Sequence, residues 1–69
     1  MMKLEYDKEA DAAYVYLADS IPDGKAAKTV ELNHDIVLDF DSHGKIVGIE
    51  ILHASKVLTK KALLEAEQA

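Results

Sequence analysis

The fold is decided by residues 36–52, which read IVLDFDSHGKIVGIEIL. Two runs rich in β-branched residues, 36–41 and 46–52, flank a short loop that contains Gly44. Alternating or apolar runs around a short glycine-containing loop are typical of a β-hairpin. This stretch therefore predicts two antiparallel strands that are neighbours in a sheet.

The register of the hairpin follows from how its apolar side chains segregate, because a slip of one residue moves every side chain to the other face. Pairing Phe40 with Ile46 would place Glu50 opposite Ile36 on the apolar face. Pairing Phe40 with Val47 separates apolar from polar side chains and predicts a four-residue loop, residues 42–45. One face then holds Ile36, Leu38, Phe40, Val47, Ile49 and Ile51, and the other holds Asp35, Asp39, Asp41, Gly48 and Glu50.

Three further strands are predicted before the hairpin. Residues 3–7 alternate polar and apolar positions, which is the period of a half-buried strand. Residues 13–18 are aromatic and β-branched, with few polar positions on either face, so we expect this strand in the middle of the sheet. Residues 27–32 alternate again.

Turn-forming residues separate these strands. Asp7 can accept hydrogen bonds from backbone amides ahead of it, which favours a turn after the first strand. In the segment Ile21-Pro22-Asp23-Gly24, Pro22 presets φ and Gly24 tolerates a positive φ. Gly44 serves the hairpin loop, and Gly48 faces Asp39, where its missing side chain leaves room.

The C-terminal segment predicts one helix over residues 54–67, which are rich in Ala, Leu, Lys and Glu. His53 or Ser55 lies near its start. Lysines precede glutamates along the segment, which opposes the helix dipole, so the helix needs packing against the sheet or a partner. Its apolar stripe comprises Val57, Leu58, Leu64 and the methylene stem of Lys61.

Together these elements predict an α+β fold, an antiparallel β-meander of about five strands followed by one C-terminal helix. A chain of 69 residues holds one small domain, which we assign to residues 1–69. Such a short chain buries only about 60% of its unfolded surface, so its core is thin.

Composition excludes several classes of protein. The chain has 13 acidic residues against 8 basic ones, all lysine, and a net charge of −5. This balance disfavours nucleic-acid binding, which needs a basic face. The absence of cysteine excludes a disulfide scaffold and a cysteine zinc site.

No membrane association is expected, because the longest apolar stretches are far shorter than the ~20 residues of a membrane helix. Residues 1–3 lead directly into Glu5 and Asp7, so we expect no signal peptide and a cytoplasmic location.

One motif has the spacing of an EF-hand calcium loop: Asp39-x-Asp41-x-His43-Gly44-x-Ile46-x-x-x-Glu50. Two observations count against calcium. Position 5 is a histidine, whose nitrogen suits a hard cation poorly, and the flanks predict strands where the motif needs helices. We favour turn chemistry for these residues and expect no metal site, with Asp39, Asp41 and Glu50 as the alternative ligand set.

Three histidines form a weaker candidate. In the preferred register His34 lies opposite His53, close enough to share a metal ion, whereas His43 is at the other end of the hairpin. Two imidazoles without a third ligand make a poor zinc site, so we interpret them as edge residues.

The acidic residues and tyrosines show no sign of catalysis. Two carboxylates in a shared pocket could act as general acid and base, but nothing indicates that Asp7, Asp11, Asp39, Asp41 or Glu50 converge. The sequence therefore predicts no catalytic residues and no cofactor. Tyr6, Tyr14 and Tyr16 are expected in the core or at an interface, since base stacking would need a basic surround.

Several segments resemble a bacterial family of small proteins, domain-of-unknown-function family 2283. They are Tyr6-Asp7, Asp11-Ala12-x-Tyr14 and Asp39-x-Asp41-x-x-Gly44-x-x-Gly48-Ile49-Glu50-Ile51-Leu52-x-Ala54-Ser55. His53 departs from the acidic or amide residue usual before Ala-Ser. The resemblance implies a compact antiparallel sheet with a terminal helix and brings no activity or catalytic residues. It also implies an antitoxin-like role in a two-gene unit.

Two functional hypotheses follow. The first is a non-enzymatic protein-interaction module, a homodimer or the partner of a basic protein from a neighbouring gene; the thin core and the weak helix both favour it. The alternative is a metal-binding protein or metal-dependent hydrolase that uses the acidic face of the 35–52 hairpin. We expect interaction rather than catalysis.

Overall fold

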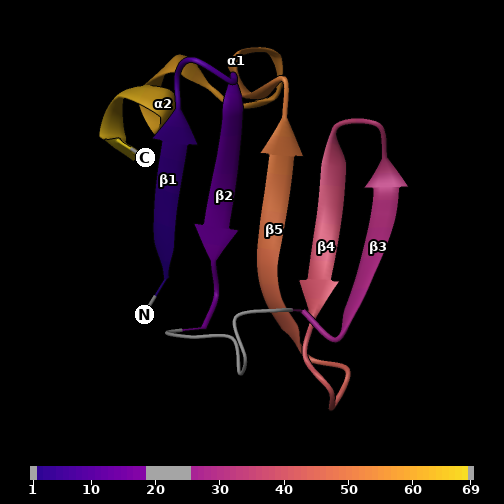
Figure 1. Cartoon of the computed structure of the whole chain (residues 1–69). Coiled ribbons are helices and arrows are strands. Elements are labelled where there is room, and N and C mark those ends of the chain that lie inside the picture. Colours follow the sequence, from indigo (N-terminus) through magenta and orange to yellow (C-terminus); the bar gives the residue numbers. More distant parts are fainter. Residues whose placement is uncertain (1, 19–25, 69) are drawn as a thin grey trace.

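The computed structural model describes residues 2–18 and 26–68, which form one twisted sheet with two short helices at one end (Figure 1). The sheet order in these residues is β3-β4-β5-β2-β1-β6. The strands are β1 (Lys3–Asp7), β2 (Ala12–Tyr16), β3 (Lys28–Asn33), β4 (Ile36–Phe40), β5 (Ile46–Leu52) and β6 (Glu67–Gln68), and the helices are α1 (Ala54–Val57) and α2 (Lys60–Glu65).

The α+β class is confirmed, but the predicted meander is wrong at one connection. Strand β2 pairs with β5, not with β3, so the sequential hairpins β1-β2 and β3-β4-β5 join through β2 and β5. Five of the six residues of β3 are exposed, whereas β2 has no exposed residue. An apolar strand gains more from two neighbours than a polar strand does, which places β2 inside the sheet and β3 at its edge.

The hairpin register is confirmed over most of its length. Ile36 pairs with Ile51, Leu38 with Ile49, and Asp39 with Gly48, as predicted. A bulge then shifts the pairing, so that Phe40 lies opposite Ile46 and not opposite Val47. The loop therefore comprises residues 41–45, one residue more than predicted.

The structure also tests the predicted turn residues. The Asp7 carboxylate accepts hydrogen bonds from the amides of Glu9 and Ala10 at 3.1 and 3.2 Å, the contacts that a turn-forming aspartate makes. Gly44 has a φ of 79°, a conformation that its lack of a side chain permits. The predicted turn at Pro22 and Gly24 lies outside the described residues.

The predicted single helix is wrong. Leu58 adopts an extended conformation that ends α1, and Thr59 starts α2 by accepting a hydrogen bond from the Ala62 amide at 3.1 Å. Threonine is a favoured N-cap, and this signal was missed. The short strand β6 follows α2 and pairs with β1 in parallel.

The apolar stripe of the predicted helix is also corrected. Leu58 and Leu63 pack against the core, while Leu64 is 80% exposed and Val57 is 38% exposed. Splitting the helix rotates α2 relative to α1, so a stripe calculated for one continuous helix does not apply.

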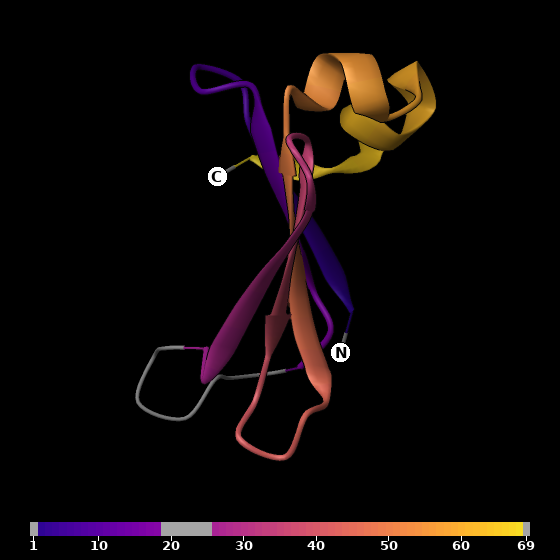
Figure 2. The same cartoon turned by 90° about the vertical axis from the view of Figure 1, so that its right-hand side faces the viewer.

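The core is small and lies where the helices meet the sheet. Ala13, Ile51 and Ala54 form its buried centre. Both helices lie on the same side of the sheet and cover only one end of it (Figure 2). The partly buried residues packed against the Ala13, Ile51 and Ala54 centre are Leu4, Tyr6, Val15, Ile49, Leu58 and Leu63.

No helix in the described residues is long and apolar enough to cross a membrane.

Candidate functional site

The face of the sheet opposite the helices is built from two rows of side chains, because residues paired side by side share a face. We call these ten residues the acidic face. The first row is Glu5, Tyr14, Glu50, Val37 and Glu31, and the second is Lys3, Tyr16, Gly48, Asp39 and Thr29.

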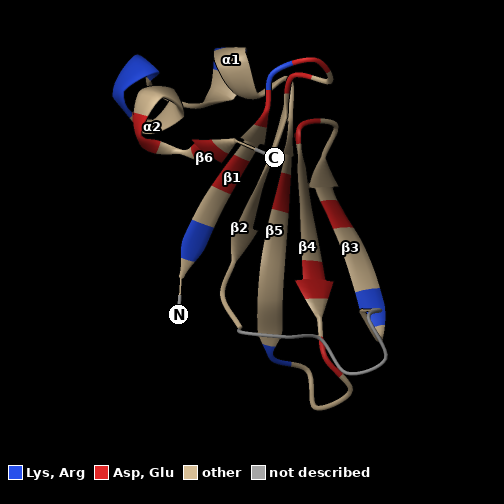
Figure 3. Ribbon diagram, turned by 60° about the vertical axis from the view of Figure 1, so that its left-hand side comes forward, with Lys and Arg blue, Asp and Glu red and all other residues tan. Residues whose placement is uncertain are grey.

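Carboxylates are spread across the acidic face, where β1, β3, β4 and β5 each carry acidic positions (Figure 3). Four carboxylates lie there against the single positive charge of Lys3. The face thus holds −3 of the net charge of −5. Glu31 and Glu50 are both exposed.

Tyr14 occupies the middle of this face. Its hydroxyl donates to Asp39 Oδ2 at 2.7 Å, and the Thr29 hydroxyl donates to Asp39 Oδ1 at 3.0 Å. The ring lies over Gly48, where an added Cβ would overlap the phenol. Desolvation and the hydrogen bond to Asp39 raise the pKa of Tyr14 well above its usual value, so the phenol stays neutral and serves as a donor.

Tyr16 lies beside Tyr14 and is held in the same way. Its hydroxyl donates to Glu5 Oε1 at 2.9 Å, and Lys3 Nζ lies 3.1 Å from Glu5 Oε2. The two tyrosine rings meet edge to face with centroids 4.6 Å apart. Hydrogen bonds from Lys3 and then from Tyr16 lower the pKa of Glu5. Both rings are therefore held in place by hydrogen bonds within the chain.

The alternative metal ligands are not assembled into a site. Asp41 lies in the hairpin loop and accepts from the amides of His43 and Lys45 at 2.8 and 3.0 Å, as the turn interpretation predicts. Asp39 is engaged by Tyr14 and Thr29. Within residues 2–18 and 26–68, no group of three His, Cys, Asp or Glu side chains is placed to hold a metal ion.

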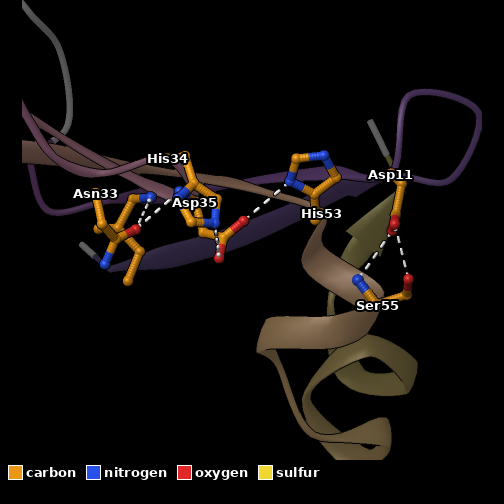
Figure 4. Close-up of polar contacts among 7 residues, drawn as sticks. Asp11, Asn33, His34, Asp35, His53 and Ser55 are labelled. Carbon is orange, nitrogen blue, oxygen red and sulfur yellow. Dashed lines mark hydrogen bonds and ion pairs between the residues drawn. The ribbon is translucent and has the colours of Figure 1, made fainter.

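A second polar cluster joins the β1-β2 turn to the start of α1 (Figure 4). Asp11 accepts from the Ser55 amide at 2.9 Å and from the Ser55 hydroxyl at 2.7 Å. The Tyr6 hydroxyl donates to the same carboxylate at 2.8 Å. Hydrogen bonds from Ser55 and then from Tyr6 lower the pKa of Asp11. The hydrogen bond to Asp11, together with desolvation, raises the pKa of Tyr6.

The two histidines at this end share a carboxylate. His53 Nδ1 lies 2.9 Å from Asp35 Oδ1, and His34 Nε2 lies 3.7 Å from Asp35 Oδ2. His53 occupies the N-cap position of α1 with a φ of 54°, but its side chain makes no cap hydrogen bond. The Asp11 carboxylate accepts from the Ser55 amide in its place. Ser55 Oγ donates to Asp11, so the serine, histidine and aspartate of this cluster do not form a nucleophile–base relay.

Comparison with known proteins places the chain in a family. Residues 3–55 match the model of a family described as a protein of unknown function, DUF2283. The chain belongs to the DUF2283 family. The resemblance based on Tyr6, Asp11, Tyr14 and the 39–55 segment is thereby confirmed, and in the DUF2283 chain these positions pair in space, Tyr6 and Ser55 on Asp11 and Tyr14 on Asp39.

A relative of this DUF2283 chain is "Uncharacterized protein MJ0789" from Methanocaldococcus jannaschii, which is 46% identical over 56 residues. The match covers 81% of this chain and 44% of the relative, so the chain spans less than half of that protein's length. The relative is archaeal, so the similarity does not point to a bacterial source alone. No solved structure matches the chain.

Proposed function

We propose that this DUF2283 domain is a non-enzymatic interaction module that binds a basic protein through the acidic face. The observation that supports this proposal most directly is the clustering of four carboxylates and two fixed tyrosines on the sheet face that the helices leave open. A partner with a basic surface would gain both charge complementarity and aromatic contact there.

The tyrosines favour a protein partner over a simple counter-ion. Tyrosine is enriched at protein interfaces because its ring buries apolar area while its hydroxyl stays hydrogen-bonded. Tyr14 and Tyr16 keep their hydroxyls paired to Asp39 and Glu5, so their rings lose little freedom when a partner packs on them. Glu50 lies beside Tyr14, and Glu31 lies two strands further along the same row. Both are exposed, so a partner that packs on the rings can bring Lys or Arg to them.

The test is co-expression with the protein encoded beside this chain, followed by light scattering of the purified material. The double variant E31Q/E50Q removes two charges from the acidic face. Its matched control, E9Q/E65Q, removes two charges from the β1-β2 turn and from α2. We expect a complex with the natural chain and the control, and at least about tenfold weaker binding with E31Q/E50Q.

A lysine-rich peptide is the defined probe when binding is followed by NMR. The expected result is amide shifts in β2, β4 and β5 that fade at high salt, because exposed charges are screened. Shifts confined to the helices, or equal loss of binding in both double variants, would contradict the proposal.

A further inference from the structure

We infer that a second copy of this chain packs on the half of the opposite sheet face that the helices leave uncovered. We call this surface the open half and define it by Val30, Ile36, Leu38 and Phe40 of β3 and β4. The proposal concerns the face opposite the acidic face, so it stands independently of the proposed basic partner.

The open half extends the apolar face of the sheet beyond the part that the helices cover (Figure 2). Leu4, Val15, Ile49, Leu38 and Val30 form one unbroken apolar row across five strands. The first three pack against the Ala13, Ile51 and Ala54 cluster under the helices, whereas Leu38 and Val30 do not. All four residues of the open half are only partly buried.

The chain exposes more surface than a compact monomer of its mass. The chain exposes 5093 Å². A folded monomer of 7.6 kDa is expected to expose about 4300 Å² from the scaling of surface with mass. The excess of about 800 Å² belongs to the whole chain and reflects a sheet that the helices cover at one end only (Figure 2). A second copy on the open half would bury apolar side chains that the helices do not reach.

The distribution of charge selects this face for self-association. The acidic face carries four carboxylates, so two copies meeting there would repel each other. On the other face, the side chains that β3 and β4 contribute include no carboxylate; Lys28, next to Phe40, is the charged residue there. Two copies related by a twofold axis can therefore pack sheet on sheet, about 10 Å apart, without opposing like carboxylates.

The first measurement is solution mass by light scattering for the natural chain and for the variants L38Q and V37Q. Leu38 and Val37 are neighbours in β4 and are both partly buried, but they face opposite sides of the sheet. We expect a species of twice 7.6 kDa for the natural chain and for V37Q. L38Q should raise the dimer dissociation constant about tenfold or more.

A cross-linking experiment avoids any loss of folding in L38Q. The chain has no cysteine, so a single introduced thiol reports one position. With a bis-maleimide that spans about 10 Å, the distance between packed sheets, V30C should cross-link to a dimer and E31C, on the acidic face, should not. A natural chain that stays monomeric at sub-millimolar concentration, or equal cross-linking of V30C and E31C, would overturn the inference. The variant E31Q/E50Q should remain dimeric, because its two substitutions lie on the acidic face. This outcome would distinguish self-association from binding of the proposed basic partner.

Discussion

Asp11 caps a helix, α1, that begins more than forty residues later in the chain, at Ala54. Its two carboxylate oxygens accept from the amide and the hydroxyl of Ser55 at 2.9 and 2.7 Å, and its backbone carbonyl accepts from the Ala54 amide at 2.9 Å. The β1-β2 turn thus supplies the cap that His53 does not provide. This contact ties α1 to the sheet and satisfies amides that a helix start otherwise leaves unpaired.

Replacement of Asp11 should therefore destabilise the fold more than replacement of Ser55. D11A removes the acceptor of three hydrogen bonds, from the Ser55 amide, the Ser55 hydroxyl and Tyr6. S55A removes one of them and leaves the capped amide in place. Urea titrations should show a lower midpoint for D11A than for S55A, and equal midpoints would contradict the capping role.

The same carboxylate should make stability depend on acid. Hydrogen bonds from Ser55 and Tyr6 lower the pKa of Asp11 in the folded state. Its contribution is therefore present above the unfolded pKa, near 3.9, and is lost as the pH falls through the lower folded pKa. Below about pH 4, D11N should lose less stability per pH unit than the natural chain. E9Q, which removes one charge from the same turn, should follow the natural chain.

Gly48 should tolerate no side chain while Tyr14 is present. In G48A the new methyl group would overlap the Tyr14 ring, and overpacking of this kind costs about 1–3 kcal/mol. Combining G48A with Y14L removes the clash, so the double variant should lose less than the sum of the single variants. A double-mutant cycle from urea unfolding measures this coupling, and strict additivity would show that the ring does not fill this space.

Leu63 and Leu64 are adjacent in α2, but truncation to alanine should lower the free energy of unfolding only at Leu63. Leu63 packs against the core, whereas Leu64 is 80% exposed. L63A should cost about 1–3 kcal/mol of unfolding free energy, less than a fully buried leucine, and L64A should stay within about 0.5 kcal/mol. Thermal and urea unfolding of both variants test this, and a larger cost for L64A would restore the stripe predicted for one continuous helix.

Thr59 should hold the boundary between the two helices. Its side chain accepts from the Ala62 amide at 3.1 Å, so T59A should cost about 1 kcal/mol. T59S keeps the acceptor and should remain close to the natural chain. Urea midpoints for the pair separate loss of the cap from loss of the methyl group, and equal destabilisation by both would argue against the cap.

Local patterns in the sequence determined the first five strands, most of the hairpin register and the turn at Asp7, but not β6, which the run of helix formers hid. Period-two alternation and turn residues act within a few positions along the chain, so they can be recognised without a tertiary model. The alternation of side chains between the two faces of the hairpin also placed Asp39, Gly48 and Glu50 together on the polar face, as the structure has them. The Thr59 cap was also a local signal, although the continuous run of helix formers concealed it.

Only the tertiary structure decided which strands pair across the sheet and which side chains fill its faces. The choice of β5 over β3 as the neighbour of β2 depends on a comparison of burial over the whole sheet, not on any local pattern. The contacts of Asp11 with Ser55 and of Tyr14 with Asp39 join residues 44 and 25 positions apart. Hydrogen bonds at such separations form only after the sheet has brought their partners together, so a reading of spacing alone could not find them.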